Sequence, residues 1–522
     1  MSEIVKNKMN IFFSDRTQRI LFSIVVLITI GFLLYPKYLP MVDLPQHVGL
    51  VVVFDDLLKG RSVWSSMLWI NWDTPYIGSY LYWLLWYQVL PILWATKAVI
   101  ISIFLLYIYA IRLLRRTFQA DRMLDWVGLT CFFGYSFQYG FVSYMAGAAF
   151  GLLFLALNKR YLDNPNKKDW WLILLTGVLT YFNHLLAFAF FCMTAYAYFI
   201  FSSLKPFSWQ QRIKFTLPYV LFALLLLHYL TTPNPVQSDL WQEHQTVWSM
   251  DKSFNIDLWK IKLSNLLIFP WDIKDFKWVY IVLLLLPLLL AKHNKKYYII
   301  LSCALVVYFI LPDVVRESNH LYRRFAWMVV VFYFLLWQPC LKELNMYQSN
   351  IMKISSLLFM AIISFLMFEV YINNIRFAHS QTVKDFDTIF QTMQPRKRIL
   401  YINERNNNPY GEFIKTHNVY HDFPVYYQAL KHGWYDPSYA SEHAIPVRLN
   451  KNSNYNREFL IGRAFDPKIM EKELNCTPYD YIIIRSHFNA NIINKILVNN
   501  LSCKQMKVII ETKSAVLLSL DK

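Results

Sequence analysis

The sequence predicts a polytopic α-helical membrane protein of about eleven spans with a soluble C-terminal α/β domain, and three observations support this. First, 56% of the 522 residues are apolar and only 16% are charged, unlike an ordinary globular mixture. Second, the apolar residues form blocks of about 17 to 25, the length that a helix needs to cross about 30 Å of hydrocarbon. Third, these blocks stop near residue 372. We therefore expect a transmembrane domain at 1–372 and a separate domain at 373–522.

The first span is expected at 20–35. The formal net charge is +18, but lysine and arginine gather in short loops between apolar blocks. This distribution is typical of cytoplasmic loops, so it indicates topology and no nucleic-acid partner. The basic N-terminal stretch, ending at Arg16 and Arg19, is therefore placed in the cytoplasm. No small-residue cleavage site follows the first apolar block, so we interpret it as a retained span that opens into an outer loop at 36–91.

The other spans follow from the same rule. The segment 76–90 is apolar, but a span there would put the arginine cluster of 112–122 outside. We therefore interpret it as a juxtamembrane helix, and we also expect a second outer loop at 232–276. The protein would be a multi-pass protein of a bacterial inner (plasma) membrane, with its C-terminal domain in the periplasm. The remaining spans are expected at 94–114, 124–136, 141–157, 170–182, 186–201, 215–230, 278–290, 297–311, 325–339 and 351–372.

The region 373–522 has the pattern of a small α/β unit. A helical period runs through 383–393, short β-type runs occupy 398–403, 481–485, 507–511 and 515–518, and 492–498 is expected to be helical. Cys476 and Cys503 lie in this region, and an extracytoplasmic location favours a disulfide between them. The aromatic segment 420–439 is typical either of stacking on sugar rings or of packing onto the membrane domain.

The candidate chemistry lies in the first outer loop. No acidic residue falls at the middle of a predicted span, which argues against ion-coupled transport. Asp43 stands before an amphipathic helix expected at 48–58, where it is either a helix N-cap or a general base at the membrane surface. His47 follows one turn later, as a polar residue at the boundary or as a group that positions a substrate. The adjacent Asp55 and Asp56 are expected to solvate this helix.

The other outer segments supply cations. Lys97 stands near the outer end of the second span, where it either snorkels to the interface or binds a phosphate. An Arg-rich group lies between the ninth and tenth spans, with acids interleaved; its arginine forks either bind a phosphate or form salt bridges among themselves. The candidate substrate-binding residues are His47, Lys97, Gln138, Tyr139, His184, Arg316, His320, Arg323 and Arg324.

Several motifs of catalysis are missing from the sequence. There is no Walker loop, no paired CxxC site, no GxSxG elbow and no HExxH. A cytosolic nucleotide donor therefore has no support. We assign no cofactor and no metal ligand, and no motif supports a divalent cation.

The arrangement resembles the GT-C superfamily of integral-membrane glycosyltransferases, which use polyprenyl-phosphate sugars. The resemblance lies in a first span, a long outer loop that opens with Asp43, juxtamembrane helices, a basic inner turn at 112–122 and an outward domain after the last span. Asp43-Leu44-Pro45-Gln46-His47 replaces the Asp-Glu or Glu-bearing versions found elsewhere. The segment 136–144 stands where many relatives carry an acid and an arginine, and it carries neither charge.

The resemblance implies an inverting transfer. Asp43 would deprotonate an acceptor hydroxyl, which attacks the anomeric carbon opposite the phosphate, while Arg323, Arg324 or Lys97 stabilises charge on the leaving lipid phosphate. The implied partners are a polyprenyl-phosphate sugar donor, a glycan, lipid or protein acceptor of the cell envelope, and membrane lipids. Two alternatives remain: a transporter or flippase for lipid-linked glycans, and a non-catalytic membrane assembly protein.

Overall fold

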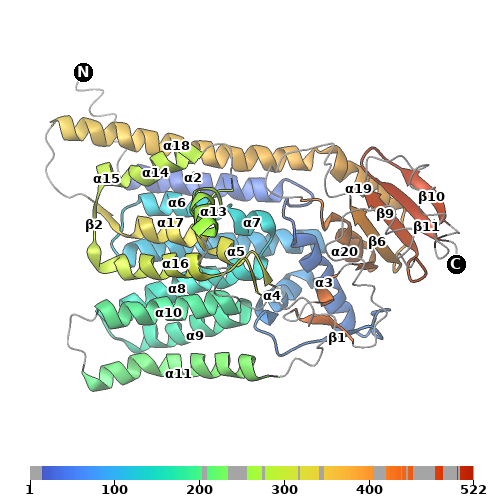
Figure 1. The fold of residues 1–522 in the computed structure, drawn as a ribbon, viewed down its shortest axis with the longest axis horizontal. Helices are drawn as coiled ribbons and strands as arrows, with labels where there is room; N and C mark the ends of the chain where they lie inside the picture. Colours follow the sequence, from blue (N-terminus) through green and yellow to red (C-terminus); the bar gives the residue numbers. More distant parts are fainter. Residues whose placement is uncertain are drawn as a thin grey trace.

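The computed structural model describes residues 15–202, 208–232, 256–272, 277–315, 318–339, 346–403, 419–436, 438–441, 445–450, 476–485, 503 and 506–520. The predicted outer loop at 232–276 therefore lies mostly outside the described residues, as does the predicted helix at 492–498. The described part is predominantly helical, as predicted, with long helices side by side and a small sheet at one end (Figure 1).

The predicted apolar blocks form helices, except that the block at 325–339 is helical only to Leu335 and ends in strand β5 (Trp337–Pro339). The first block is α2 (Asp15–Leu34), and the segment 36–91, predicted as the first outer loop, contains α3 (Leu44–Leu58) and α4 (Ile77–Tyr87). The segment expected as the third span is broken after Cys131, where α6 ends and a short helix, α7, follows a turn. The other helices in this part are α5 (Ile92–Thr117), α6 (Met123–Cys131), α7 (Tyr135–Tyr139), α8 (Val142–Asp163), α9 (Lys167–Asn183), α10 (Leu185–Ser202), α11 (Trp209–Thr231), α13 (Ile256–Ile268), α14 (Lys277–Leu285), α15 (Pro287–Leu290), α16 (Tyr298–Ile310), α17 (Ala326–Leu335) and α18 (Met346–Ala378).

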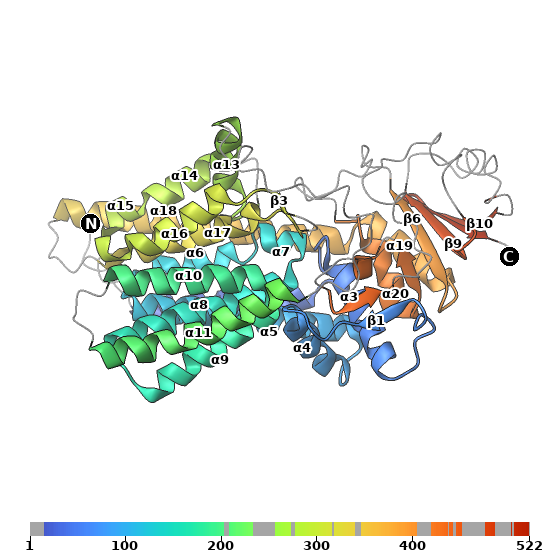
Figure 2. The ribbon, with the colours of Figure 1, turned by 60° about the horizontal axis from the view of Figure 1, so that its bottom comes forward.

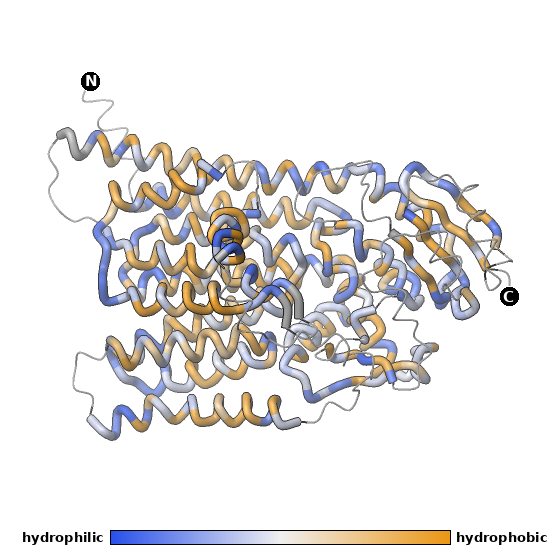
Figure 3. Tube along the Cα trace, viewed as in Figure 1, coloured by the Kyte–Doolittle hydropathy of each residue, from blue (hydrophilic) through white to orange (hydrophobic). Residues whose placement is uncertain are grey.

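Five of the described helices are long and apolar enough to cross a membrane: α2, α5, α8, α11 and α18. On α11 an apolar stripe at helical spacing is more than half exposed, although a soluble protein would cover it. Figure 3 shows hydrophobic residues over most of the bundle and hydrophilic ones at its ends. The outer surface of the bundle therefore suits a lipid environment. The stripe comprises Leu217, Val220, Leu224, Leu227 and Leu230.

The C-terminal sheet has the strand order β10-β11-β9-β6-β7. Strand β6 (Arg398–Asn403) pairs in parallel with β7 (Trp434–Asp436) and β9 (Tyr481–Arg485), whereas β11 (Val516–Leu520) pairs antiparallel with β9 and with β10 (Met506–Glu511). One face of the sheet joins the main core, and helix α19 (Gln381–Thr392) buries its apolar face there. The other face forms a smaller core that includes the disulfide between Cys476 and Cys503.

The predicted first outer loop and the C-terminal region form one packed unit (Figure 2). Strand β1 (Leu68–Ile70) pairs antiparallel with β8 (Val447–Leu449). Helix α3 packs on α20 (Tyr426–Lys431), and a Cβ at Gly49 would lie 2.9 Å from the Val425 side chain. The site residues of the loop are therefore positioned from both sides, by membrane helices and by the C-terminal region.

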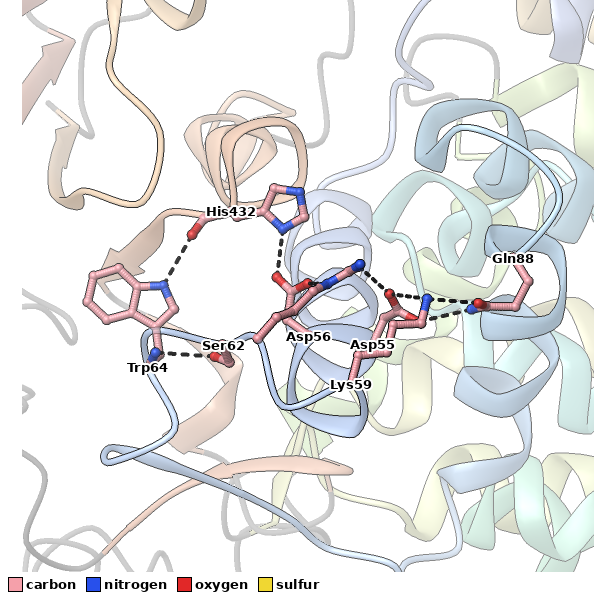
Figure 4. Close-up of polar contacts among 8 residues, drawn as sticks. Asp55, Asp56, Lys59, Ser62, Trp64, Gln88 and His432 are labelled. Atoms are coloured by element: carbon pink, nitrogen blue, oxygen red, sulfur yellow. Dashed lines mark hydrogen bonds and ion pairs between the residues drawn. The ribbon is translucent and has the colours of Figure 1, made fainter.

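Asp55 and Asp56 do not solvate α3 as expected, because both are buried. Arg61 donates to both carboxylates at 2.5–2.6 Å, and His432 Nδ1 lies 2.6 Å from Asp56 Oδ2. Lys59 and Gln88 complete the contacts of Asp55 (Figure 4). The expectation failed because the partners of the two carboxylates include His432, which lies 376 positions away along the chain. The pair joins the outer loop to the C-terminal region.

Candidate active site

The loop before α3 is held by α7. The backbone N–H of Asp43 donates to Tyr139 O at 2.8 Å, and that of Val42 donates to Gln138 O at 3.1 Å. Gly140 ends α7 with φ of +90°, a left-handed conformation that favours glycine. A Cβ there would lie 2.8 Å from the Leu44 backbone nitrogen, so only glycine allows this approach. The backbone of α7 thus fixes where Asp43 stands.

The Asp43 carboxyl is buried at the junction with the C-terminal region. Asp43 occupies the N-cap position of α3, but its side chain makes no capping hydrogen bond. Helix capping is therefore not the role of this carboxyl. Burial, followed by the nearby charge of Asp422, raises its pKa well above the ordinary value. A hydrogen bond from Tyr439 and the charge of Arg324 act in the opposite direction. The result is a shielded acid with increased basicity.

His47 lies one turn along α3 and is also buried. Its Nδ1 is 2.7 Å from the Tyr80 hydroxyl, and its ring meets Tyr439 edge-on at a centroid distance of 5.9 Å. Burial, followed by the charge of Arg324, lowers the pKa of His47 to about 4. His47 is therefore neutral at physiological pH and can orient a polar neighbour without adding charge.

Asp422 is the acid that sequence reasoning missed. It is buried, and Gln46 Nε2 donates to its Oδ1 at 3.1 Å. The Tyr439 backbone N–H donates in turn to Gln46 Oε1 at 3.3 Å. Burial is the main cause that raises the pKa of Asp422 above its ordinary value. Asp43 of the first loop and Asp422 of the C-terminal region therefore both have raised pKa values, and the charge of Asp422 contributes to the shift of Asp43.

Arg324 is the cation whose charge lowers the pKa of Asp43. Its guanidinium stacks on the Phe141 ring at 3.9 Å, and its Nη1 is 3.2 Å from His184 Nε2. Because a guanidinium only donates, His184 Nε2 must accept. Burial and then the charge of Arg324 lower the pKa of His184, which fits a neutral acceptor. The histidine and the aromatic ring thereby orient the guanidinium.

Arg323 immediately precedes Arg324 in the chain but contacts a different set of residues, which includes Asp313. Its Nη2 donates to Asp313 Oδ2 at 2.6 Å, so this arginine is neutralised by a salt bridge. His320 Nε2 lies 2.8 Å from the Tyr139 hydroxyl, and the Tyr139 ring stacks on Tyr135 at 5.2 Å. His320 packs against α7 through these two tyrosines. Its link to the Asp43 loop is therefore indirect and runs through α7.

The remaining predicted residues have other contacts or lie outside the described part. Lys97 Nζ donates to the Leu34 carbonyl at 2.7 Å, at the end of α2, and packs over Trp94. The Gln138 side chain donates to the Phe133 carbonyl at 3.3 Å. Its contact with the loop before α3 is made by its backbone carbonyl, which accepts from the Val42 N–H. Arg316 lies outside the described residues. Within the described residues, no group of three or more His, Cys, Asp or Glu is placed to hold a metal ion.

Comparisons with known proteins find similarity among solved structures. No family model and no curated protein matches the sequence. Among solved structures, the arabinofuranosyltransferase AftD from mycobacteria is similar, with a TM-score of 0.45 and 10% sequence identity. The match covers 98% of this chain and 40% of that one, so this chain spans about two fifths of that enzyme. A similarity at this level assigns neither family nor activity, and the site has to be interpreted from its own residues.

Proposed function

We propose that this protein transfers a sugar from a polyprenyl-phosphate donor to an acceptor hydroxyl, with inversion, at the membrane surface that carries the C-terminal region. The observation that carries the proposal is the buried Asp43 carboxyl, which has a raised pKa and an oriented arginine within electrostatic range. A carboxylate of raised pKa is a stronger base than an exposed one, and an arginine fork suits a phosphate.

The proposed step moves one proton and exchanges one bond. Asp43 accepts the proton of the acceptor hydroxyl, and that oxygen forms a bond to the anomeric carbon. The bond from this carbon to the phosphate oxygen breaks, and the electron pair leaves with the polyprenyl phosphate. Arg324 stabilises the charge that develops on this leaving group. His184, which accepts from Arg324 Nη1 at 3.2 Å, is a positioning residue.

Access to the base requires a local movement. The Asp43 residue is only 6% exposed, and Tyr439 of the C-terminal region hydrogen-bonds to its carboxyl, while Asp422 is near enough for its charge to raise the pKa of Asp43. An acceptor hydroxyl reaches the carboxyl only when these contacts open. The C-terminal region therefore covers the base until an acceptor binds, which would keep water from the donor.

The test is sugar transfer by the purified full-length protein in lipid nanodiscs. A panel of polyprenyl-phosphate pentoses and hexoses serves as donor, and release of polyprenyl phosphate is measured in the presence of envelope glycan acceptors. Asp43→Asn should lower the rate about 100- to 10,000-fold, because a general base contributes that much. The matched control is Asp73→Asn, an exposed acid of the same outer loop. A near-normal rate in Asp43→Asn would contradict the proposal.

A further inference from the structure

A second polar site lies at the opposite end of the helix bundle. Here α2, the end of α5 and the start of α6 enclose a cavity of about 300 Å³. Five arginines line it, against one carboxylate, that of Asp125. The cavity lies far from the candidate active site, since α5 runs from the outer loop at Ile92 to this end at Thr117 (Figure 1). The arginines are Arg19, Arg112, Arg115, Arg116 and Arg122.

The single carboxylate of the cavity is already engaged. Arg115 Nε donates to Asp125 Oδ1 at 2.8 Å, and both side chains are largely buried. Arg112 differs, because its Nε is buried and has no hydrogen-bond partner among the described residues. A buried donor without an acceptor is costly, so this nitrogen favours the binding of an acceptor that enters the cavity. The excess of positive charge indicates that the acceptor is an anion.

The wall of the cavity is aromatic and fixed. The Phe22 and Trp126 rings meet edge-on at 5.1 Å, and Trp126 Nε1 donates to Gln18 Oε1 at 3.2 Å. The Arg112 guanidinium lies 5.5 Å from the Phe22 ring centroid. The cavity thus combines an aromatic side, formed by Phe22 and Trp126, and a cationic side. This combination suits a ligand with a phosphate head and an apolar body.

We propose that this cavity binds the phosphate of an anionic phospholipid. The lipid source, as opposed to free phosphate, is favoured because the cavity opens between two helices, α2 and α5, that are each long and apolar enough to cross a membrane. Headgroups lie at the ends of such helices, and basic pockets between them are suited to anionic headgroups. The bound lipid tethers the first span to the start of α6. This site is independent of the proposed sugar transfer.

The test uses the full-length protein and a double variant, Arg112→Gln with Arg116→Gln. These two positions leave the pair of Arg115 and Asp125 intact. The control variant is Arg212→Gln with Lys214→Gln, which removes two exposed charges from α11 outside the cavity. Affinity for short-chain phosphatidylglycerol is measured by native mass spectrometry and by the shift in Tm. Phosphatidylcholine and inorganic phosphate serve as separate arms.

The double variant should bind phosphatidylglycerol about 30-fold more weakly, which corresponds to about 1 kcal/mol for each arginine removed. The control variant and the phosphatidylcholine arm should show no such change. If the double variant does not fold, Arg112→Gln alone gives the same comparison. Equal losses in the double variant and the control overturn the site. Equal stabilisation of the wild type by inorganic phosphate overturns the lipid as its source.

Discussion

Helix α3 carries buried acids at both of its ends, and their surroundings are opposite. At the C-terminal end, burial raises the pKa of Asp56, but hydrogen bonds from His432 and Arg61 outweigh it and the pKa lies below the ordinary value. At the N-terminal end, burial and Asp422 raise the pKa of Asp43. Burial is therefore common to both ends, and the difference is the counter-charge.

This difference separates a structural acid from a candidate catalytic one. A buried acid whose charge is matched by neighbouring cations holds two segments together and has no charge left for a substrate. A buried acid beside a second acid is kept at a cost in stability, and such perturbed groups gather at functional sites. On one helix, the pair Asp55 and Asp56 fits the first description and Asp43 fits the second.

Exchange of Asp43 for Asn should sharpen the contrast most. The rate of sugar transfer should fall about 100- to 10,000-fold. The Tm of the variant should not fall. The folded-state pKa of Asp43 is raised, so its contribution to stability is present at low pH and is lost as pH rises through that pKa. An amide does not ionise, so the Tm of Asp43→Asn at alkaline pH should equal or exceed that of the wild type. A large drop in Tm at alkaline pH would show that Asp43 is structural.

Exchange of Asp56 for Asn should have the reverse effect. The amide cannot accept charge-assisted hydrogen bonds from both Arg61 and His432, so the free energy of unfolding should fall by about 1 to 3 kcal/mol. Thermal unfolding in nanodiscs measures this loss. The control is Asp73→Asn, whose exposed pair with His228 should contribute at most about 1 kcal/mol. If both variants unfold alike, the Asp56 cluster does not join the two regions.

Exchange of Gly140 for Ala tests how α7 positions the Asp43 loop. The left-handed backbone should cost about 1 to 2 kcal/mol with a side chain, and the new Cβ would also press on Leu44 N. Gly60→Ala is the matched control, since Gly60 has φ of +64° but nothing within 4 Å of the added Cβ. Both variants should lose similar stability, but only Gly140→Ala should also lose transfer rate. Equal rates would show that the approach of α7 does not matter.

The sequence was sufficient to predict most of the helices and to select Asp43 as a candidate, but not to predict the surroundings of Asp43. Blocks of apolar residues have a physical length, and the strand at 398–403 is a short apolar run of β-type residues, so both can be recognised locally. Asp422 has no such pattern: it is a single acid in an aromatic segment, and its partner Gln46 is 376 positions away. The aromatic content of 420–439 was the available signal. It indicated packing or stacking but could not indicate which acid would be buried.

The partnership of Asp43 and Asp422 can be tested through pH dependence. Because Asp43 acts as a base, the transfer rate should fall as pH drops through its pKa. Asp422 raises that pKa, so Asp422→Asn should move the acid limb of the rate profile to lower pH, whereas Asp422→Glu should leave it near the wild-type position. Arg324 and Tyr439, which act in the opposite direction, are unchanged in both variants. A limb that moves equally in the two variants would mean that packing at position 422, and not its charge, sets the basicity of Asp43.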